Sequence, residues 1–480
     1  MIKLLNKNRL FFIVFSLLVM WELYIMVRLP KQAWVEGLLE SWYTSKGLVF
    51  YKDFINQYPP FLHMLMVPYH KIFGFTQTPT LVLAPLNSIL IIVILSIASF
   101  RWLKGKYRVL PILFFVFWDP VLSMNHFSTA AFHELVNLLA FVLWLAWYKK
   151  ESRSIALIIG FLLSSSLFSM HISVFFVCSI FLTFIFKPQS FLFALIGFLL
   201  PPFYIFIWFL KHNALYELYW WNLVYYLKYY PYTNLGRGLV NTVTFLAVFS
   251  PLLFAVRSKV SPVVILILIS LPLSIWFAIF HPIRFQIALP IYAFVFGWGL
   301  EKMSKMKQKK YINRALILLV LVLNIASFYY YMFPFYKSSF AYRRDRSIIT
   351  KLYSDDPMYE AVNWIKDNTP DDAKLFVMAD PMFHIETNRL PVSARGTMNQ
   401  PFTYEPLDTL GQELDENPPD YWIVDERLVN ERFPQFGYEH TKDYFNKLLL
   451  CEPGVARMEY ITIRKHVPGK KLCLGETNDY

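Results

Sequence analysis

Four carboxylates occur at positions from which they could move protons or bind cations beside a membrane. Glu36 and Asp53 lie in one segment after the first apolar run, and Asp119 and Glu134 flank a later, shorter connection. A charge is costly to keep at the edge of a bilayer, so acids found there are functional candidates. Gathered on one membrane face, they can serve as a general base with its partner, or hold a divalent cation such as Mg²⁺ or Mn²⁺. Each can instead cap a helix or accept a hydrogen bond at the interface.

One cation stands out in the segment HPIRF, where Arg284 is the only basic residue between two apolar runs. A guanidinium at this position suits a phosphate, which it can bind through two parallel hydrogen bonds. It can equally extend along the membrane edge toward water. The histidines of the nearby connections, His126, His133 and His281, show no spacing typical of a metal site, so we expect them to form interfacial hydrogen bonds.

The composition shows what must position these residues. The 480 residues are 56% hydrophobic, 19% aromatic and only 16% charged, against about 25% charged in a soluble domain. This excludes a soluble globular enzyme and a disordered protein. Residues 1–336 hold 28 Lys and Arg but nine acids, whereas residues 337–480 hold 18 Lys and Arg and 24 acids. The positive charge therefore belongs to the apolar part, where it reports membrane topology and gives no reason to expect a nucleic-acid partner.

Apolar runs close to the roughly 20 residues that cross a bilayer recur along residues 1–336. They predict a polytopic α-helical membrane protein with about eleven spans, followed by an extracytoplasmic α/β domain at 337–480. The expected spans are 10–27, 80–100, 109–124, 130–147, 154–170, 172–186, 190–210, 238–256, 260–280, 285–300 and 315–335. The segment 60–75 is too short to count among them.

Lysine and arginine concentrate in alternate connections between the spans, and short basic loops stay in the cytoplasm. This predicts a protein of the cytoplasmic membrane with its N-terminus in the cytoplasm and its tail outside the cell membrane. No small-residue cleavage site follows the first span, so we expect a retained anchor. The connections expected outside are 28–79, 119–129, 211–237 and 281–284.

The external parts carry patterns of their own. Apolar residues at helical intervals predict an amphipathic helix within 33–47, and the segment 214–234 is dense in Tyr and Trp, as is typical of a membrane interface. In the tail, a helical pattern over 358–373 is followed by strand-like runs, which predicts a small α/β domain. The strand-like runs are 374–380, 420–426 and 457–465. Cys451 and Cys473 both fall in this external tail, and the sequence leaves open whether they form a disulfide.

The stretch WVEGLLESWYTSKGLVFYKDFINQYPPFLHMLMVPYHKIFGF, residues 34–75, resembles the first outer loop of the GT-C superfamily of polytopic glycosyltransferases. That superfamily includes protein mannosyltransferases and lipid A aminoarabinose transferases. The resemblance rests on Glu36-Gly37, the turn Tyr51-Lys52-Asp53-Phe54, the paired prolines Pro59-Pro60, and Gly74. The segments 284–299 and 361–380 are similar to a late span and to the external domain of the same group.

The resemblance implies an inverting transferase that takes a hexosyl or pentosyl unit from a polyprenyl-phosphate donor. Glu36 would be the base that accepts the proton of the acceptor, with Asp53 as the other candidate, and Asp119 and Glu134 would form a second acidic site. Arg284 and Lys52 would balance the charge that grows on the departing lipid phosphate. The acceptor implied is a lipid, a glycan or a protein, and membrane lipids surround the enzyme.

Two departures from the family pattern are Val35, where the family has an acid, and Tyr58, where aminoarabinose transferases have a lysine. Trp220-Trp221 is followed by Asn222 instead of Asp, which favours transfer of one sugar over transfer of a whole oligosaccharide. Two other classes of function stay open: a transporter or flippase of lipid-linked sugars, and a receptor or scaffold anchored by its helices. Scarce charges in mid-span and the lack of an internal repeat argue against the transporter.

Overall fold

A computed structural model of the chain divides by its internal contacts into two compact units. The first, here called the helical unit, comprises Met1–Trp34, Gln77–Phe206 and Tyr232–Asp345, and the second, the sheet unit, comprises Val35–Thr76, Ile207–Pro231 and Arg346–Tyr480. The expected division after residue 336 falls beside residues outside the described part and stays a prediction. The residues described are 9–28, 35–56, 58–122, 127–225, 238–258, 260–277, 282–306, 310–334, 337, 357–392, 407–427, 429–430, 443, 445–447, 449 and 452–467.

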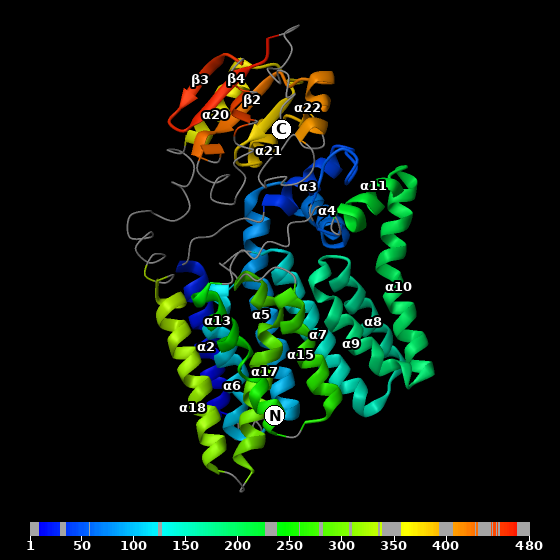
Figure 1. Cartoon of the computed structure of the whole chain (residues 1–480), viewed down its shortest axis with the longest axis vertical. Coiled ribbons are helices and arrows are strands. Elements are labelled where there is room, and N and C mark those ends of the chain that lie inside the picture. The colour runs from blue at the N-terminus through cyan, green and yellow to red at the C-terminus, as the bar shows by residue number, and fades with distance from the viewer. Residues whose placement is uncertain are drawn as a thin grey trace. The chain divides into compact units, whose positions relative to one another are not determined.

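Each of the expected spans falls on one helix or on consecutive helical segments (Figure 1). Within the described part of the chain, five helices are long and apolar enough to cross a membrane: Gln77–Trp102, Thr129–Lys150, Pro188–Lys211, Leu239–Arg257 and Lys310–Met332. The count of eleven spans and their orientation stay predictions. The helices of these segments are α2 (Arg9–Arg28), α5 (Gln77–Trp102), η1 (Gly105–Arg108), α6 (Leu110–Leu122), α7 (Thr129–Lys150), α8 (Arg153–Leu167), η2 (His171–Ser173), α9 (Val174–Ile185), α10 (Pro188–Lys211), α13 (Leu239–Phe249), α14 (Leu252–Arg257), α15 (Pro262–Phe277), α16 (Pro282–Phe285), η4 (Gln286–Ala288), α17 (Leu289–Ser304), α18 (Lys310–Ser327) and η5 (Phe328–Met332).

Close backbone approach joins α8 to α10. A Cβ atom at Gly160 would overlap the carbonyl oxygen of Ala194, and one at Gly197 would overlap the carbonyl oxygen of Leu157. Small residues at such crossings let membrane helices pack through van der Waals contact, because lipid supplies no hydrophobic force between helices. These two glycines therefore set the distance between α8 and α10.

The sheet unit contains a four-stranded sheet with the order β1-β2-β4-β3 (Figure 1). Strand β1 (Leu375–Met378) pairs parallel to β2 (Tyr421–Asp425), whereas β4 (Ile461–Lys465) pairs antiparallel with both β2 and β3 (Gly454–Met458). The expected strands 374–380 and 420–426 are confirmed. The single strand expected over 457–465 is wrong, because Glu459 turns the chain with a φ of +48° and divides the segment into the hairpin β3–β4.

Alternate residues of β1 and β2 enter different hydrophobic clusters on the two faces of the sheet. Phe376 and Trp422 pack with Leu410 and Leu414, and Leu375 and Ile423 pack with Ala361, Val362 and Ile365. Leu410 and Leu414 belong to α22 (Leu407–Glu416). Ala361, Val362 and Ile365 belong to α20 (Pro357–Asn368), which confirms the helix expected after residue 358.

The predicted amphipathic helix of the first loop is confirmed as α3 (Val35–Ser45). It packs against α4 (Phe61–Phe73) and against α21 (Met382–Thr387), which follows β1. Its apolar residues Leu38, Leu39, Trp42 and Tyr43 are buried, and the Tyr43 ring lies 5.8 Å from the ring of His384. The first loop therefore belongs to the same unit as the C-terminal sheet, an association that the sequence analysis did not anticipate.

Candidate active site

Three buried carboxylates come together in the helical unit, each from a different helix. Glu22 of α2, Asp119 of α6 and Glu134 of α7 each have an exposed fraction of 0%. Glu22 interacts electrostatically with Asp119 and Glu134, and Glu134 interacts in the same way with Asp119. We name Glu22, Asp119 and Glu134 the acid cluster. Buried acids are rare in apolar helices, and their presence in a membrane segment points to function.

The acid cluster is held by neutral hydrogen-bond donors. Ser88 of α5 donates from its hydroxyl to Asp119 Oδ2 over 2.7 Å, and Gln286 of η4 donates from Nε2 to Glu134 Oε2 over 2.9 Å. Glu134 Oε1 and Gln286 Oε1 are buried and accept no hydrogen bond from the residues described. Buried polar atoms are nearly always satisfied in native proteins, so two neighbouring acceptors without donors leave room for a ligand or water that donates.

Arg284 lies two residues before Gln286, on the short helix α16 that leads into η4. Its guanidinium is partly buried, donates from Nη1 to Met170 Sδ over 3.4 Å, and interacts electrostatically with His133, the neighbour of Glu134 in α7. The structure thus brings Asp119 and Glu134 together, and it places Arg284 two residues before the glutamine that donates to Glu134.

A second set of predicted residues lies in the sheet unit, in the turn between α3 and α4. The Asp53 carboxylate accepts the N–H of Val49 over 2.7 Å through Oδ2, and the Asp53 N–H returns a hydrogen bond of 2.9 Å to the Val49 carbonyl. Tyr51 at the tip has a φ of +64°, which is strained for an aromatic residue. Backbone strain of this kind is found preferentially at functional sites. Lys52 follows it, exposed to solvent.

The ring of Tyr51 anchors this turn. Its hydroxyl donates to the Tyr58 carbonyl over 2.6 Å, and Asn222 Oδ1 lies 3.5 Å from the same hydroxyl. The ring stacks on Phe209 at a centroid distance of 5.7 Å. Burial raises the pKa of the Tyr51 phenol well above its ordinary value, an effect that the hydrogen bond with Asn222 opposes. Tyr51 therefore acts as a neutral donor.

Beneath the turn lies a polar group that the sequence analysis missed. Glu40 of α3 forms a short ion pair with His63 of α4, and the Asn56 amide donates a short hydrogen bond to the same carboxylate. All three side chains are buried. Asn56 Oδ1 in turn accepts the N–H of Tyr58 over 2.8 Å. This group fixes the ends of the turn that presents Lys52 and Asp53.

The backbone of Glu36 lies at the start of α3, while its side chain is outside the described part. Glu36, Lys52 and Asp53 belong to the sheet unit, and Asp119, Glu134 and Arg284 belong to the helical unit, so the structure gives two separate groups. His126, His281, Cys451, Cys473 and residues 226–234 of the aromatic segment also fall outside the described residues. Within the described ranges, no three His, Cys, Asp or Glu residues are arranged to hold a metal ion.

Glu22 and Gln286 are the site residues that sequence reasoning did not select. Glu22 is one of only nine acids in residues 1–336, and its place inside the first apolar run was an available signal. Gln286 carries no charge and follows Arg284 in an apolar segment. Nothing in its spacing indicates that it meets a residue 152 positions away.

No family model and no curated protein matches this sequence. The fold, however, is similar to that of ArnT from Cupriavidus metallidurans bound to undecaprenyl phosphate, with a TM-score of 0.58 at 10% identity over 96% of this chain and 99% of that one. The apo state of the same ArnT gives a TM-score of 0.56 at 11% identity, covering 96% and 98%.

The Archaeoglobus fulgidus oligosaccharyltransferase tethered to an acceptor peptide gives a TM-score of 0.51 at 12% identity, covering 88% of this chain and 70% of that one. ArnT, an aminoarabinose transferase, and this oligosaccharyltransferase are both GT-C glycosyltransferases. With 96% of its length matched against ArnT, this chain shares the fold of these structures.

Proposed function

We propose that the protein is a membrane glycosyltransferase that moves a sugar from a polyprenyl-phosphate donor to an acceptor at the outer face of the membrane. The observation that carries the proposal is the fold shared over 96% of the chain with an ArnT that binds undecaprenyl phosphate. A fold alone hosts several functions, so the residues of the two groups must support the same chemistry. Carboxylates and a guanidinium are what this transfer needs.

The transfer is inverting in this account, with Glu36 as the general base. Its carboxylate takes the proton from the acceptor hydroxyl or amine as that atom attacks the anomeric carbon. The bond from the anomeric carbon to the phosphate oxygen breaks, and polyprenyl phosphate leaves with the bonding electrons. Asp53 is the weaker candidate because one of its oxygens already accepts the Val49 N–H and closes the turn.

The leaving phosphate needs positive charge, and Arg284 and Lys52 supply it. Arg284 offers a planar guanidinium that can bind two phosphate oxygens, and Lys52 is an exposed ammonium at the tip of a strained turn. Charge that grows during the reaction is stabilised by donors fixed beforehand. This is the reason to assign the two cations to the donor and not to the acceptor.

We assign the sugar to the acceptor oxygens of Glu134 and Gln286. Both residues keep a buried oxygen without a donor among the described residues, and the hydroxyls of a sugar supply donors of this kind. The assignment requires no metal ion. Asp119 and Glu22 interact electrostatically with Glu134 and so influence how it meets the sugar.

The acid cluster also favours one rival. Buried carboxylates within apolar helices are typical of transport pathways, so a flippase of lipid-linked sugars is the second candidate. Purified protein in detergent, given a panel of polyprenyl-phosphate sugars and a membrane lipid extract, distinguishes the two. A transferase releases polyprenyl phosphate only when acceptor is present. A flippase releases none, but moves the lipid-linked sugar across the bilayer of liposomes.

A further inference from the structure

A cavity of about 460 Å³ opens at the end of the helical unit where α7 and α17 finish. It is formed between α7, α15, α17 and the end of α5. Part of its lining consists of large apolar side chains, namely Trp102, Phe141, Leu145, Val264, Phe294 and Trp298. Its remaining lining is Lys104, Tyr148, Lys149, Glu301, Lys302 and Lys305. An apolar wall with a basic rim is the arrangement that binds lipid head groups between membrane helices.

The rim carries more positive charge than its own acid can neutralise. Glu301 forms a short ion pair with Lys305 and accepts the backbone N–H of Lys104 over 2.9 Å. Lys149 and Lys302 are exposed, and within the described part they form no ion pair with a carboxylate. Two ammonium groups are therefore left at the mouth of the cavity for an anion.

The cavity is separate from the candidate active site. Helix α7 carries Glu134 near its start and Lys149 near its end, which at the rise of an α-helix puts their backbones about 22 Å apart. By the predicted orientation, the basic rim lies at the cytoplasmic side, whereas the donor and acceptor meet at the outer side. A donor lipid in transfer would not reach both.

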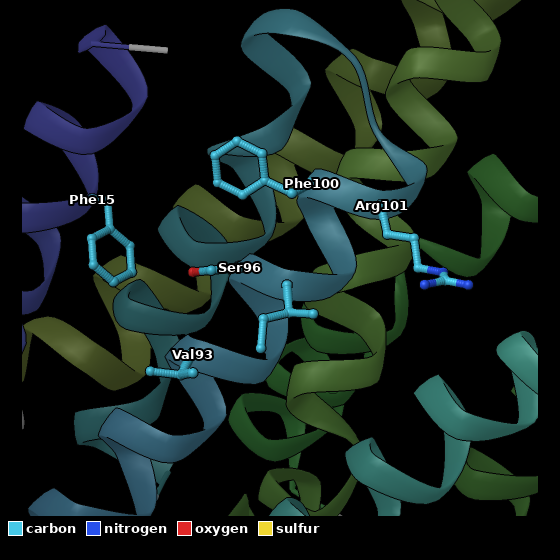
Figure 2. Close-up of a pocket in the computed structure, with 6 residues that line it drawn as sticks. Phe15, Val93, Ser96, Phe100 and Arg101 are labelled. Carbon is cyan, nitrogen blue, oxygen red and sulfur yellow. The ribbon is translucent and has the colours of Figure 1, made fainter. Parts of the chain in front are cut away.

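A second groove, of about 530 Å³, shows what the basic rim adds. It lies between α2 and α5 and is lined by Phe15, Val93, Ser96, Ile97, Phe100 and Arg101. Figure 2 shows Phe15 facing the α5 residues Val93 and Ser96, while the guanidinium of Arg101 points away from them. Arg101 is the one cationic residue that lines this groove, and its guanidinium points away, so the groove has no feature that selects an anion. We therefore assign a ligand to the first cavity because of its charge and not because of its apolar surface alone.

We propose that the cavity between α7, α15 and α17 binds an anionic phospholipid. The phosphate lies between Lys149 and Lys302, and one acyl chain runs along Phe141, Leu145 and Val264. Trp102 and Trp298 also line the cavity, and indole rings are enriched at the head-group level of a membrane. The apolar lining fits a lipid acyl chain, and the two lysines fit a head group with a negative charge.

Native mass spectrometry of the purified, delipidated full-length protein tests the proposal, with phosphatidylglycerol, phosphatidylcholine, dihexanoyl phosphatidylglycerol and inorganic phosphate as separate probes. The variant K149Q/K302Q removes the rim charge, and K106Q/K150Q is the matched control because neither of its lysines lines the cavity. Lysines near an anionic lipid contribute about 1 kcal/mol each, so phosphatidylglycerol binding should fall at least about tenfold in K149Q/K302Q and stay unchanged in the control.

The other probes give the results that overturn the proposal. Equal binding of phosphatidylcholine, or no loss in K149Q/K302Q, would show that head-group charge is not recognised. Retention of inorganic phosphate or of the short-chain lipid as strongly as the long-chain lipid would show an anion site without a chain site. The proposal stands if long-chain phosphatidylglycerol is preferred over all three and the preference disappears with the two lysines.

Discussion

Gln286 donates a 2.9 Å hydrogen bond from Nε2 to Oε2 of Glu134, 152 positions earlier in the chain. The bond ties η4 to α7. Because Arg284 precedes Gln286 by two residues, the same bond fixes the segment that carries Arg284. The Gln286 amide therefore links Glu134 to the segment of Arg284, two residues that were selected separately from the sequence.

Replacing Gln286 by Leu should lower both stability and activity. The change leaves a buried Glu134 carboxylate without its donor, which costs about 1–3 kcal/mol. The expected result is a lower thermal unfolding midpoint in detergent and a transfer rate reduced at least about tenfold. The matched control is Q286E/E134Q, which exchanges the amide and the acid and keeps one donor between them. Unchanged stability in Gln286→Leu would show that the bond does not hold η4.

Replacing Arg284 by Ala should weaken the donor and not the acceptor. A bidentate, charge-assisted contact with phosphate is worth about 1.5–3 kcal/mol, so KM for the polyprenyl-phosphate sugar should rise about 10- to 100-fold. Arg284→Lys should recover part of the loss, since it keeps the charge but not the fork. Initial rates at varied donor and fixed acceptor measure this. A donor KM equal to that of wild type would remove Arg284 from the site.

Asp53 distinguishes a structural acid from a catalytic one. Asp53→Asn keeps an oxygen that can accept the Val49 N–H, so the turn and most of the activity should survive. Asp53→Ala removes the acceptor, and we expect at least a tenfold loss of rate with the fold intact. Turnover in the purified variants, with circular dichroism as the control for folding, checks both. Complete loss in Asp53→Asn would make Asp53 the base in place of Glu36.

The crossing of α8 and α10 should not tolerate a methyl group. Gly160→Ala and Gly197→Ala each place a Cβ on a carbonyl oxygen of the other helix, so the helices must separate. Overpacking of this kind typically costs about 1–3 kcal/mol and should lower the thermal unfolding midpoint by several degrees. Gly238→Ala is the control, since no atom lies within 4 Å of its added Cβ. Equal midpoints in all three would refute the close approach.

The parts of the fold that the sequence predicted are those with strong local patterns. Long apolar runs placed a helix at every expected span, and short strand-like runs located β1 and β2. The segment 457–465 was misjudged because a hairpin through a left-handed Glu459 has the same alternation as one longer strand. Local pattern does not report where a chain reverses unless a turn residue marks the position.

For the candidate site, the residue types in the sequence indicated which side chains were candidates, but the sequence did not indicate which side chains contact one another. Asp119, Glu134 and Arg284 were selectable because charges are rare in apolar segments, and the structure brings Asp119 and Glu134 together. The donors Gln286 and Ser88, and the buried group of Glu40, Asn56 and His63, depend on contacts between distant segments. Neutral donors in apolar helices leave no signal in spacing or charge.

The most direct test of the proposed transferase is acceptor-dependent release of polyprenyl phosphate by purified protein, comparing wild type with Glu36→Gln and with the exposed control Glu360→Gln. We expect release by wild type and by Glu360→Gln, and at least a hundredfold lower rate in Glu36→Gln with donor binding retained. Equal rates in all three would contradict the assignment of Glu36 as the base. Release by none of them with any donor would contradict the transferase itself.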